Sequence, residues 1–219
     1  MPAIVRYDEQ HCPIARALDV LGDRWTLLIL RELVIGDQRY TDLAAHLPGI
    51  APTLLSQRLR TMIDQGLVTT KELPPPAARS VYTVTAHGRK ATSVLRALTR
   101  FGMPLLEEPD DEVVVRPWTA AHAAVGAYFQ PLVAIGIDER YLLRIDGEEF
   151  TLSSVPGGGA PHDKPDLVLE GPARAFLDAR QGRMSIREAI ATGRLVKRGS
   201  ARALTNFTRI FQLDVPASA

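Results

Sequence analysis

The spacing of hydrophobic residues predicts mostly helices in the first half of the chain. Between residues 13 and 66 they recur every three or four positions, as on one face of a helix. Pro13, Gly22 and Gly66 stand where such helices begin or end. Two later runs are rich in β-branched residues, as strands are. The predicted elements are helices over 13–21, 24–33, 42–47 and 52–65, strands over 67–73 and 80–85, and a helix over 86–101.

These elements predict a winged helix-turn-helix, because two helices are joined by a tight turn at Pro48-Gly49 and a β-hairpin follows them. Short polar residues stand where helices begin. We expect Asp23, Thr41 and Thr85 to cap the helices that follow them, since their side-chain oxygens can accept hydrogen bonds from free backbone N–H groups.

A different pattern begins after the acidic segment EEPDDEVVVRP, residues 107–117. Because acidic residues and a proline end the helical run, we place a domain boundary there, between residues 1–108 and 109–219. Further on, Asp146-Gly147 joins two β-type runs and predicts a hairpin with a two-residue turn. The other predicted elements are an amphipathic helix over 118–129, strands over 166–171 and 194–199, and helices over 173–182, 185–193 and 200–213. The fold class is therefore α+β, with a winged helix-turn-helix followed by a sheet covered by helices.

Charge is distributed unevenly along the chain, although the net charge is only +1. Residues 52–100 contain eight basic and two acidic side chains, and residues 174–209 contain nine basic and two acidic ones. Each stretch is either an ordinary solvated face or a surface that follows the phosphates of DNA or another anion.

Several classes of protein are not favoured by the sequence. A single cysteine excludes an intrachain disulfide and favours the cytoplasm. The N-terminus lacks the apolar core of a signal peptide, and no apolar run is long enough to span a membrane. The five histidines lack the spacing of metal ligands, so we expect neither a metal nor a cofactor. No catalytic triad, carboxylate pair or phosphate-binding loop is recognisable, so we do not expect an enzyme.

The helix over residues 52–65 carries the most specific candidate chemistry. On a helical wheel, Leu55, Leu59 and Met62 share one face, and short polar groups and an arginine share the other. Glutamine can recognise adenine, arginine can recognise guanine, and serine or threonine can bind a base or a phosphate. An ordinary surface helix is the alternative for this element alone. With two residues of the hairpin, the candidate DNA-binding residues are Pro52, Thr53, Ser56, Gln57, Arg60, Lys71 and Arg79.

Three segments resemble the HxlR family of bacterial winged-helix transcriptional regulators. They are CPIARALDVLGDRWTLLILREL, RYTDLAAHLPGIAPTLLSQRLRTMIDQGLV and VYTVTAHGR, within residues 11–108. The resemblance implies a homodimer that binds double-stranded DNA at an inverted-repeat operator, with dimer contacts from about residues 5–21 and 86–106. Ala51 departs from the family, which commonly has a serine at this position able to cap the recognition helix.

Cys12 allows two interpretations. It is either a small packing residue at the start of a helix, or a redox sensor whose thiol is activated by the helix N-terminus. Some regulators of this type use a cysteine at this position in the second way.

The segment from Leu167 to Phe211 is similar to the sterol-carrier-protein type of lipid-binding fold. The similarity rests on Gly-x-x-x-x-Phe, on Thr-Gly-Arg-Leu and on Gly-Ser-x-x-Ala-Leu before the last helix. It implies an apolar cavity between sheet and helices. The candidate ligand-binding residues are Phe176, Leu204, Phe207 and Phe211, for which plain core packing is the alternative.

Together these features predict a dimeric DNA-binding transcriptional regulator. We expect a repressor that an apolar or amphipathic small molecule, bound in the C-terminal domain, releases from its operator. One alternative is a redox-sensing regulator switched through Cys12. Another is a lipid carrier or enzyme in which the helical half serves for dimerisation.

Overall fold

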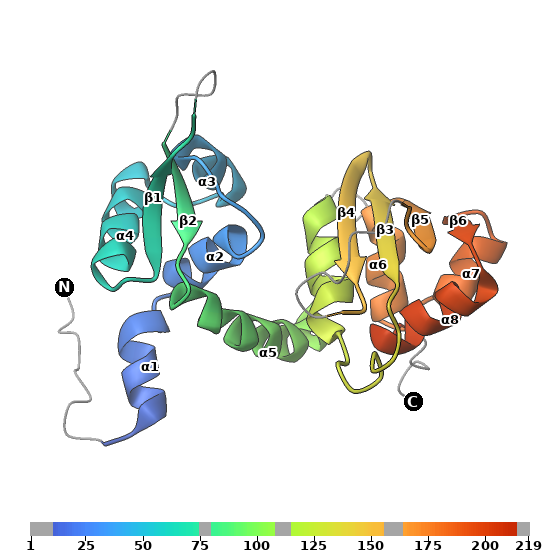
Figure 1. The fold of residues 1–219 in the computed structure, drawn as a ribbon. Helices are drawn as coiled ribbons and strands as arrows, with labels where there is room; N and C mark the ends of the chain where they lie inside the picture. Colours follow the sequence, from blue (N-terminus) through green and yellow to red (C-terminus); the bar gives the residue numbers. More distant parts are fainter. Residues whose placement is uncertain (1–10, 75–79, 108–114, 156–163, 214–219) are drawn as a thin grey trace. The chain divides into compact units, whose positions relative to one another are not determined.

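The computed structural model describes residues 11–74, 80–107, 115–155 and 164–213. The chain forms two compact units, Met1–Leu95 and Arg96–Ala219 (Figure 1). Because residues 108–114 lie outside the described part of the chain, the domain boundary placed after residue 108 stays a prediction.

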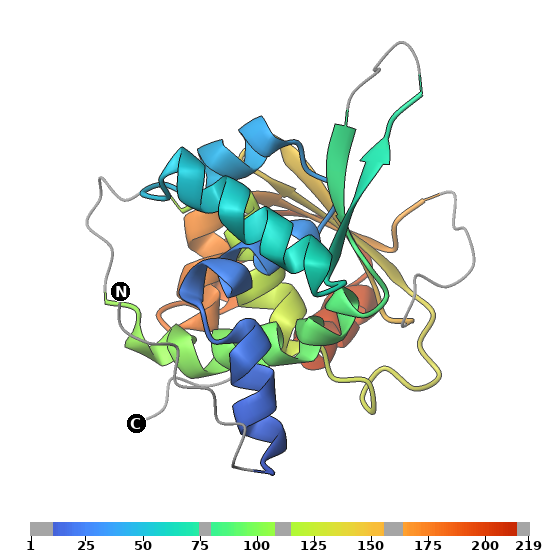
Figure 2. The same cartoon turned by 90° about the vertical axis from the view of Figure 1, so that its left-hand side faces the viewer.

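The first unit contains the predicted helices and hairpin. They are α1 (Pro13–Leu21), α2 (Arg24–Leu33), α3 (Tyr40–His46), α4 (Pro52–Asp64), β1 (Val68–Glu72), β2 (Ser80–Val84), the 3-10 turn η1 (Gly88–Ala91) and the start of α5 (Thr92–Gly102). The two strands pair antiparallel, with Thr70 opposite Tyr82. In Figures 1 and 2, α4 lies beside β1, which follows it in the chain. This arrangement confirms the predicted winged helix-turn-helix.

The apolar faces of the helices form the core of this unit. Its fully buried residues include Ile29, Leu30, Leu33, Leu43, Leu55, Leu59 and Met62. Burial of each such side chain stabilises the fold by about 1.5–3 kcal/mol. At the junction of α1 and α2, a Cβ atom on Gly22 would clash with the Leu18 carbonyl oxygen, so this close approach requires glycine.

Two of the three predicted helix caps differ from expectation. Asp23 caps α2 as predicted, but Thr41 lies inside the first turn of α3. The Asp42 carboxylate instead accepts a hydrogen bond from the Arg39 N–H at 3.1 Å, and a charged acceptor binds more strongly than a hydroxyl. The Thr85 hydroxyl accepts from the N–H of Gly88, the first residue of η1, at 3.0 Å, and α5 begins only after that turn.

The second unit is a mixed sheet with helices. After the end of α5 it contains the 3-10 turn η2 (Met103–Leu105), the π-helix η3 (Thr119–Val125), the 3-10 turn η4 (Gly126–Tyr128), β3 (Arg140–Ile145), β4 (Glu148–Ser153), β5 (Leu167–Gly171), α6 (Ala173–Arg180), α7 (Ile186–Ala191), β6 (Val196–Gly199) and α8 (Ala201–Ile210). The strand order is β4-β3-β5-β6. Strands β3 and β5 are parallel, and the other pairs are antiparallel. Asp146 and Gly147 both have positive φ, which confirms the two-residue hairpin turn.

One element of this unit has an unexpected winding. We predicted an ordinary amphipathic helix over 118–129, whereas the structure has a π-helix followed by a 3-10 turn. The buried residues Ala120, Ala121, Ala124 and Val125 still form one apolar face. The hydrophobic pattern fixes which side is buried, but it does not distinguish the two windings.

Helices cover one face of the sheet, as predicted. Tyr141, Leu143 and Ile145 alternate inward along β3 and are fully buried. They share a core with Phe176 of α6 and Phe207 of α8. Among the described residues, no helix combines the length and the apolar character that crossing a membrane requires.

Candidate nucleic-acid interface

The exposed face of α4 presents the predicted polar residues. Leu55 and Leu59 anchor the opposite face in the core. The side chains of Thr53, Gln57 and Arg60 are exposed. Within the described residues, Arg60 forms no ion pair or hydrogen bond, so its guanidinium is available for a ligand.

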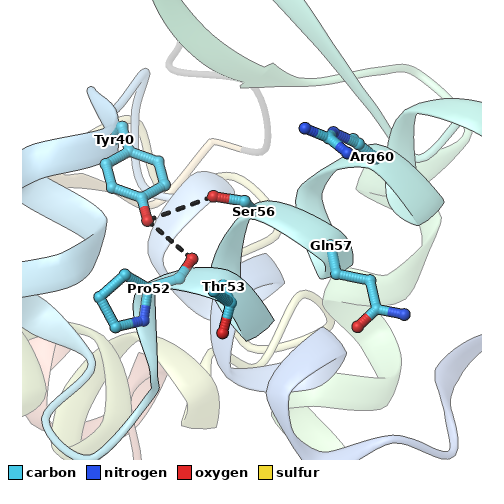
Figure 3. A pocket seen from close by; sticks show the side chains of 6 residues that line it. All are labelled: Tyr40, Pro52, Thr53, Ser56, Gln57 and Arg60. Atoms are coloured by element: carbon cyan, nitrogen blue, oxygen red, sulfur yellow. Dashed lines mark hydrogen bonds between the residues drawn. The ribbon is translucent and has the colours of Figure 1, made fainter.

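These side chains surround an open hollow of about 440 Å³ between α3 and α4 (Figure 3). Its lining contains five of the seven predicted DNA-binding residues together with one that was not predicted. The lining residues are Tyr40, Pro52, Thr53, Ser56, Gln57 and Arg60. Hydroxyl, amide and guanidinium groups therefore converge at one place, and these are groups that bind base edges and phosphates.

Tyr40 is the residue of this surface that sequence reasoning missed. Its hydroxyl donates a hydrogen bond to the Pro52 carbonyl oxygen at 2.9 Å and accepts one from the Ser56 hydroxyl at 3.3 Å (Figure 3). It thus joins the start of α3 to the first turn of α4. A tyrosine at the start of a helix carries no local signal for such a bond. Because the Ser56 proton is used, only the lone pairs of Ser56 remain for DNA.

Of the two candidate DNA-binding residues on the hairpin, only Lys71 lies in the described part of the chain. Lys71 lies on β1 with an exposed side chain, and its Nζ is 3.8 Å from the Asp37 carboxylate. Such an exposed pair contributes little to stability, so the lysine can exchange this partner for a phosphate. Arg79 lies outside the described residues.

The first turn of α4 lacks the side-chain cap that α2, α7 and α8 have. Its N-cap residue Ala51 is exposed, has extended backbone and offers no acceptor. Ala51→Ser should supply the missing oxygen and stabilise the first unit by about 1 kcal/mol. The melting temperature should rise by about 5 °C. Ala51→Val is the matched control, since valine adds volume without an acceptor, and equal melting temperatures for both variants would contradict the prediction.

The predicted effector residues all lie in the core of the second unit. Phe176, Leu204, Phe207 and Phe211 are at most 5% exposed. The Phe207 ring centroid lies 5.1 Å from that of Phe211 and 5.2 Å from that of Tyr141. The rings fill the space between the sheet and α8. A ligand cavity lined by these residues therefore stays a prediction, and it requires that the rings move apart.

Arg180 holds three elements of this unit together. Its guanidinium donates to the carbonyl oxygens of Ala124, Phe211 and Gln212 at 2.6–2.7 Å. It also stacks on the Tyr128 ring, 3.6 Å from the centroid. Burial lowers the pKa of Arg180 to about 10, so it stays charged at neutral pH. The end of α8 is thus tied to the π-helix that precedes the sheet.

Cys12 is half-buried at the N-cap position of α1, and its side chain caps no backbone N–H group. This position agrees with both interpretations of the sequence. A role in redox sensing therefore stays a prediction.

Comparison with known proteins identifies relatives of both halves. Residues 20–110 match the family described as HxlR-like helix-turn-helix, and residues 133–212 match the SCP-2 sterol transfer family. A protein named as an HTH-type transcriptional regulator from Synechocystis sp. is 36% identical over 101 residues, which are 46% of this chain and 75% of that protein. One with the same kind of name from Mycobacterium tuberculosis is 33% identical over 155 residues, 71% of this chain and 90% of that protein.

Among solved structures, the reduced form of the transcriptional regulator YodB from B. subtilis is similar at 26% identity. The match covers 46% of this chain and 100% of that chain, with a TM-score of 0.39.

Proposed function

The chain belongs to the HxlR-like helix-turn-helix family and is a transcriptional regulator, and from this premise we propose that it is a homodimeric repressor of an inverted-repeat operator. Two copies of α4 enter successive major grooves of double-stranded DNA. Their centres then lie about one helical turn, roughly 34 Å, apart or a small multiple of it. This function places the protein in the cytoplasm with the DNA.

The observation that carries this proposal is the convergence of polar groups on the hollow beside α4. Gln57 and Arg60 supply the groups that distinguish base pairs in the major groove. Thr53 and Lys71 supply groups for phosphates, and in our proposal Arg79 does the same.

Homodimerisation is supported by an apolar row on α5 and the turn that follows it. Val94, Leu98, Phe101 and Leu105 are spaced four, three and four residues apart, the spacing of a coiled-coil seam. All four are exposed, with Phe101 74% exposed. Helix α1 also exposes Ile14 and Leu18. Exposed apolar rows of this size mark surfaces that another chain covers.

The C-terminal unit is the proposed site of an apolar or amphipathic effector. Support comes from the match to the SCP-2 sterol transfer family. An effector changes DNA affinity only by its differential affinity for two conformations of the dimer. A useful switch requires about 1–3 kcal/mol of such coupling. We propose release from DNA, because a change in dimer geometry misaligns both half-sites at once.

Two measurements test this function. When DNA is titrated with the full chain, the logarithm of the association constant K should fall linearly with the logarithm of the salt concentration. A lipid carrier or an enzyme of the C-terminal unit would not show this dependence. Native mass spectrometry of the purified chain should detect a dimer and any retained amphipathic ligand. Failure to bind any duplex at low salt would refute the DNA-binding proposal.

A further inference from the structure

A second arginine of α4, Arg58, does not belong to the hollow. On the helical wheel it lies about 100° or more from Gln57, Arg60 and Thr53. Its side chain is half-buried, at 31% exposure, and its terminal nitrogen lies 2.9 Å from the Asp23 carboxylate. Arg58 therefore faces the helices of its own unit.

The partner carboxylate has two separate tasks. One oxygen of Asp23 accepts from the backbone N–H groups of Trp25 and Thr26, at 2.9 and 3.3 Å, and caps α2. The other oxygen binds Arg58 of α4. Asp23 directly follows Gly22, where α1 ends. A single side chain thus connects the α1–α2 junction to the middle of the recognition helix.

Stability alone does not explain this pair. It has one short contact, and the buried Arg58 Nε finds no acceptor among the described residues. A partly buried ion pair with an unsatisfied donor contributes little net stability, and an apolar side chain of similar size often performs as well. A charge pair does, however, fix the direction of the two groups that it joins, which an apolar contact does not.

We propose that Asp23 and Arg58 form a latch that sets the orientation of α4 relative to the α1–α2 junction, and hence the alignment of the two recognition helices on DNA. Arg58 is a positioning residue and does not contact DNA. This inference rests on the proposed function, because alignment matters only if α4 binds an operator.

The test uses the full chain and the duplex that the wild type selects from random sequence, here called the operator. Arg58→Met removes the latch, and Asp23→Asn removes its charge while the amide oxygen still caps α2. Each variant should weaken operator binding about five- to tenfold, and the double variant should lose no more than the larger single loss. The slope of log K against log salt should stay at the wild-type value, because no phosphate contact is lost.

Direct contact of Arg58 with DNA predicts the opposite results. Asp23→Asn would then leave affinity unchanged or raise it, and Arg58→Met would reduce the salt slope by about 0.9. Either result would overturn the latch, as would wild-type affinity in all variants. If the wild type itself selected no operator, the proposed function would fail first.

Two further variants guard against misfolding and general charge effects. Arg58→Lys keeps the charge and one hydrogen bond, so it should retain affinity within about threefold of the wild type. If Arg58→Lys lost as much operator affinity as is expected for Arg58→Met, this result would count against the latch, even if Arg58→Met itself unfolds. Arg144→Met removes a half-buried partner of Glu149 and Glu170 on the sheet of the second unit and should leave operator binding unchanged.

Discussion

Replacing Leu98 and Phe101 together by glutamate should convert the dimer to a monomer and weaken operator binding by about a hundredfold or more. The two side chains are 46% and 74% exposed and lie in the apolar row of α5. Two glutamates on each copy place four negative charges at the proposed interface, where they repel each other. Burying them without partners also costs on the order of several kcal/mol of desolvation free energy per charge. A monomer binds only one half-site. In a dimer, binding of the first half-site holds the second recognition helix at a high effective concentration near the second half-site, and a monomer loses this gain in affinity.

The measurement is sedimentation or light scattering at micromolar concentration, followed by titration of the operator. Leu132→Glu with Ile135→Glu is the matched control, since these residues of the second unit are 82% and 75% exposed but lie outside the apolar row. The control should remain dimeric. A double α5 variant that stays dimeric and binds as the wild type does would exclude α5 from the interface.

Phe207→Ala should destabilise the second unit by about 3–5 kcal/mol. The side chain is fully buried, and its ring contacts those of Tyr141 and Phe211. The truncation leaves a cavity, which the neighbouring rigid rings of Tyr141 and Phe211 can fill only partly. Because the first unit has a core of its own, and no residue of α5 belongs to the core around Phe207, operator binding should persist while any effector response is lost.

Hydrogen exchange followed by mass spectrometry reports the protection of backbone amides in each of the two units separately. Protection should fall in β3 and α8 and stay constant in α2 and α4. Phe207→Leu keeps most of the volume and should cost less than about 1.5 kcal/mol. Equal loss of protection in both units would show that they unfold together and would contradict the independence of their cores.

The elements that could be predicted are those with local signals. Asp23 caps α2, Gly66 follows α4 with positive φ, and Asp146-Gly147 closes the hairpin, each through its own backbone preference. The polar face of α4 also follows from the spacing of its apolar residues. The winding of residues 119–125 and the start of α3 could not be predicted, because competing hydrogen bonds decide them.

The parts of the site that were missed depend on contacts between distant residues. Tyr40 meets Pro52 and Ser56 only after α3 and α4 have packed. In the sequence, nothing distinguishes Arg58 from the other basic residues of its segment, because its partner Asp23 is brought close only by the packing of α2 and α4. Whether Phe207 lines a cavity or fills the core is a question of packing, and the hydrophobic pattern is the same in both cases.

Recognition of base pairs by α4 of a two-fold dimer is tested most directly by selecting bound duplexes from a random pool with the wild type and with Arg60→Ala. The wild type should enrich an inverted repeat with half-sites about one helical turn, or a small multiple of it, apart. Arg60→Ala should enrich the same repeat with one base pair of each half-site relaxed, and should bind the wild-type repeat about 1–3 kcal/mol more weakly. An unchanged sequence preference, with equal loss of affinity for the repeat and for random DNA, would contradict the account.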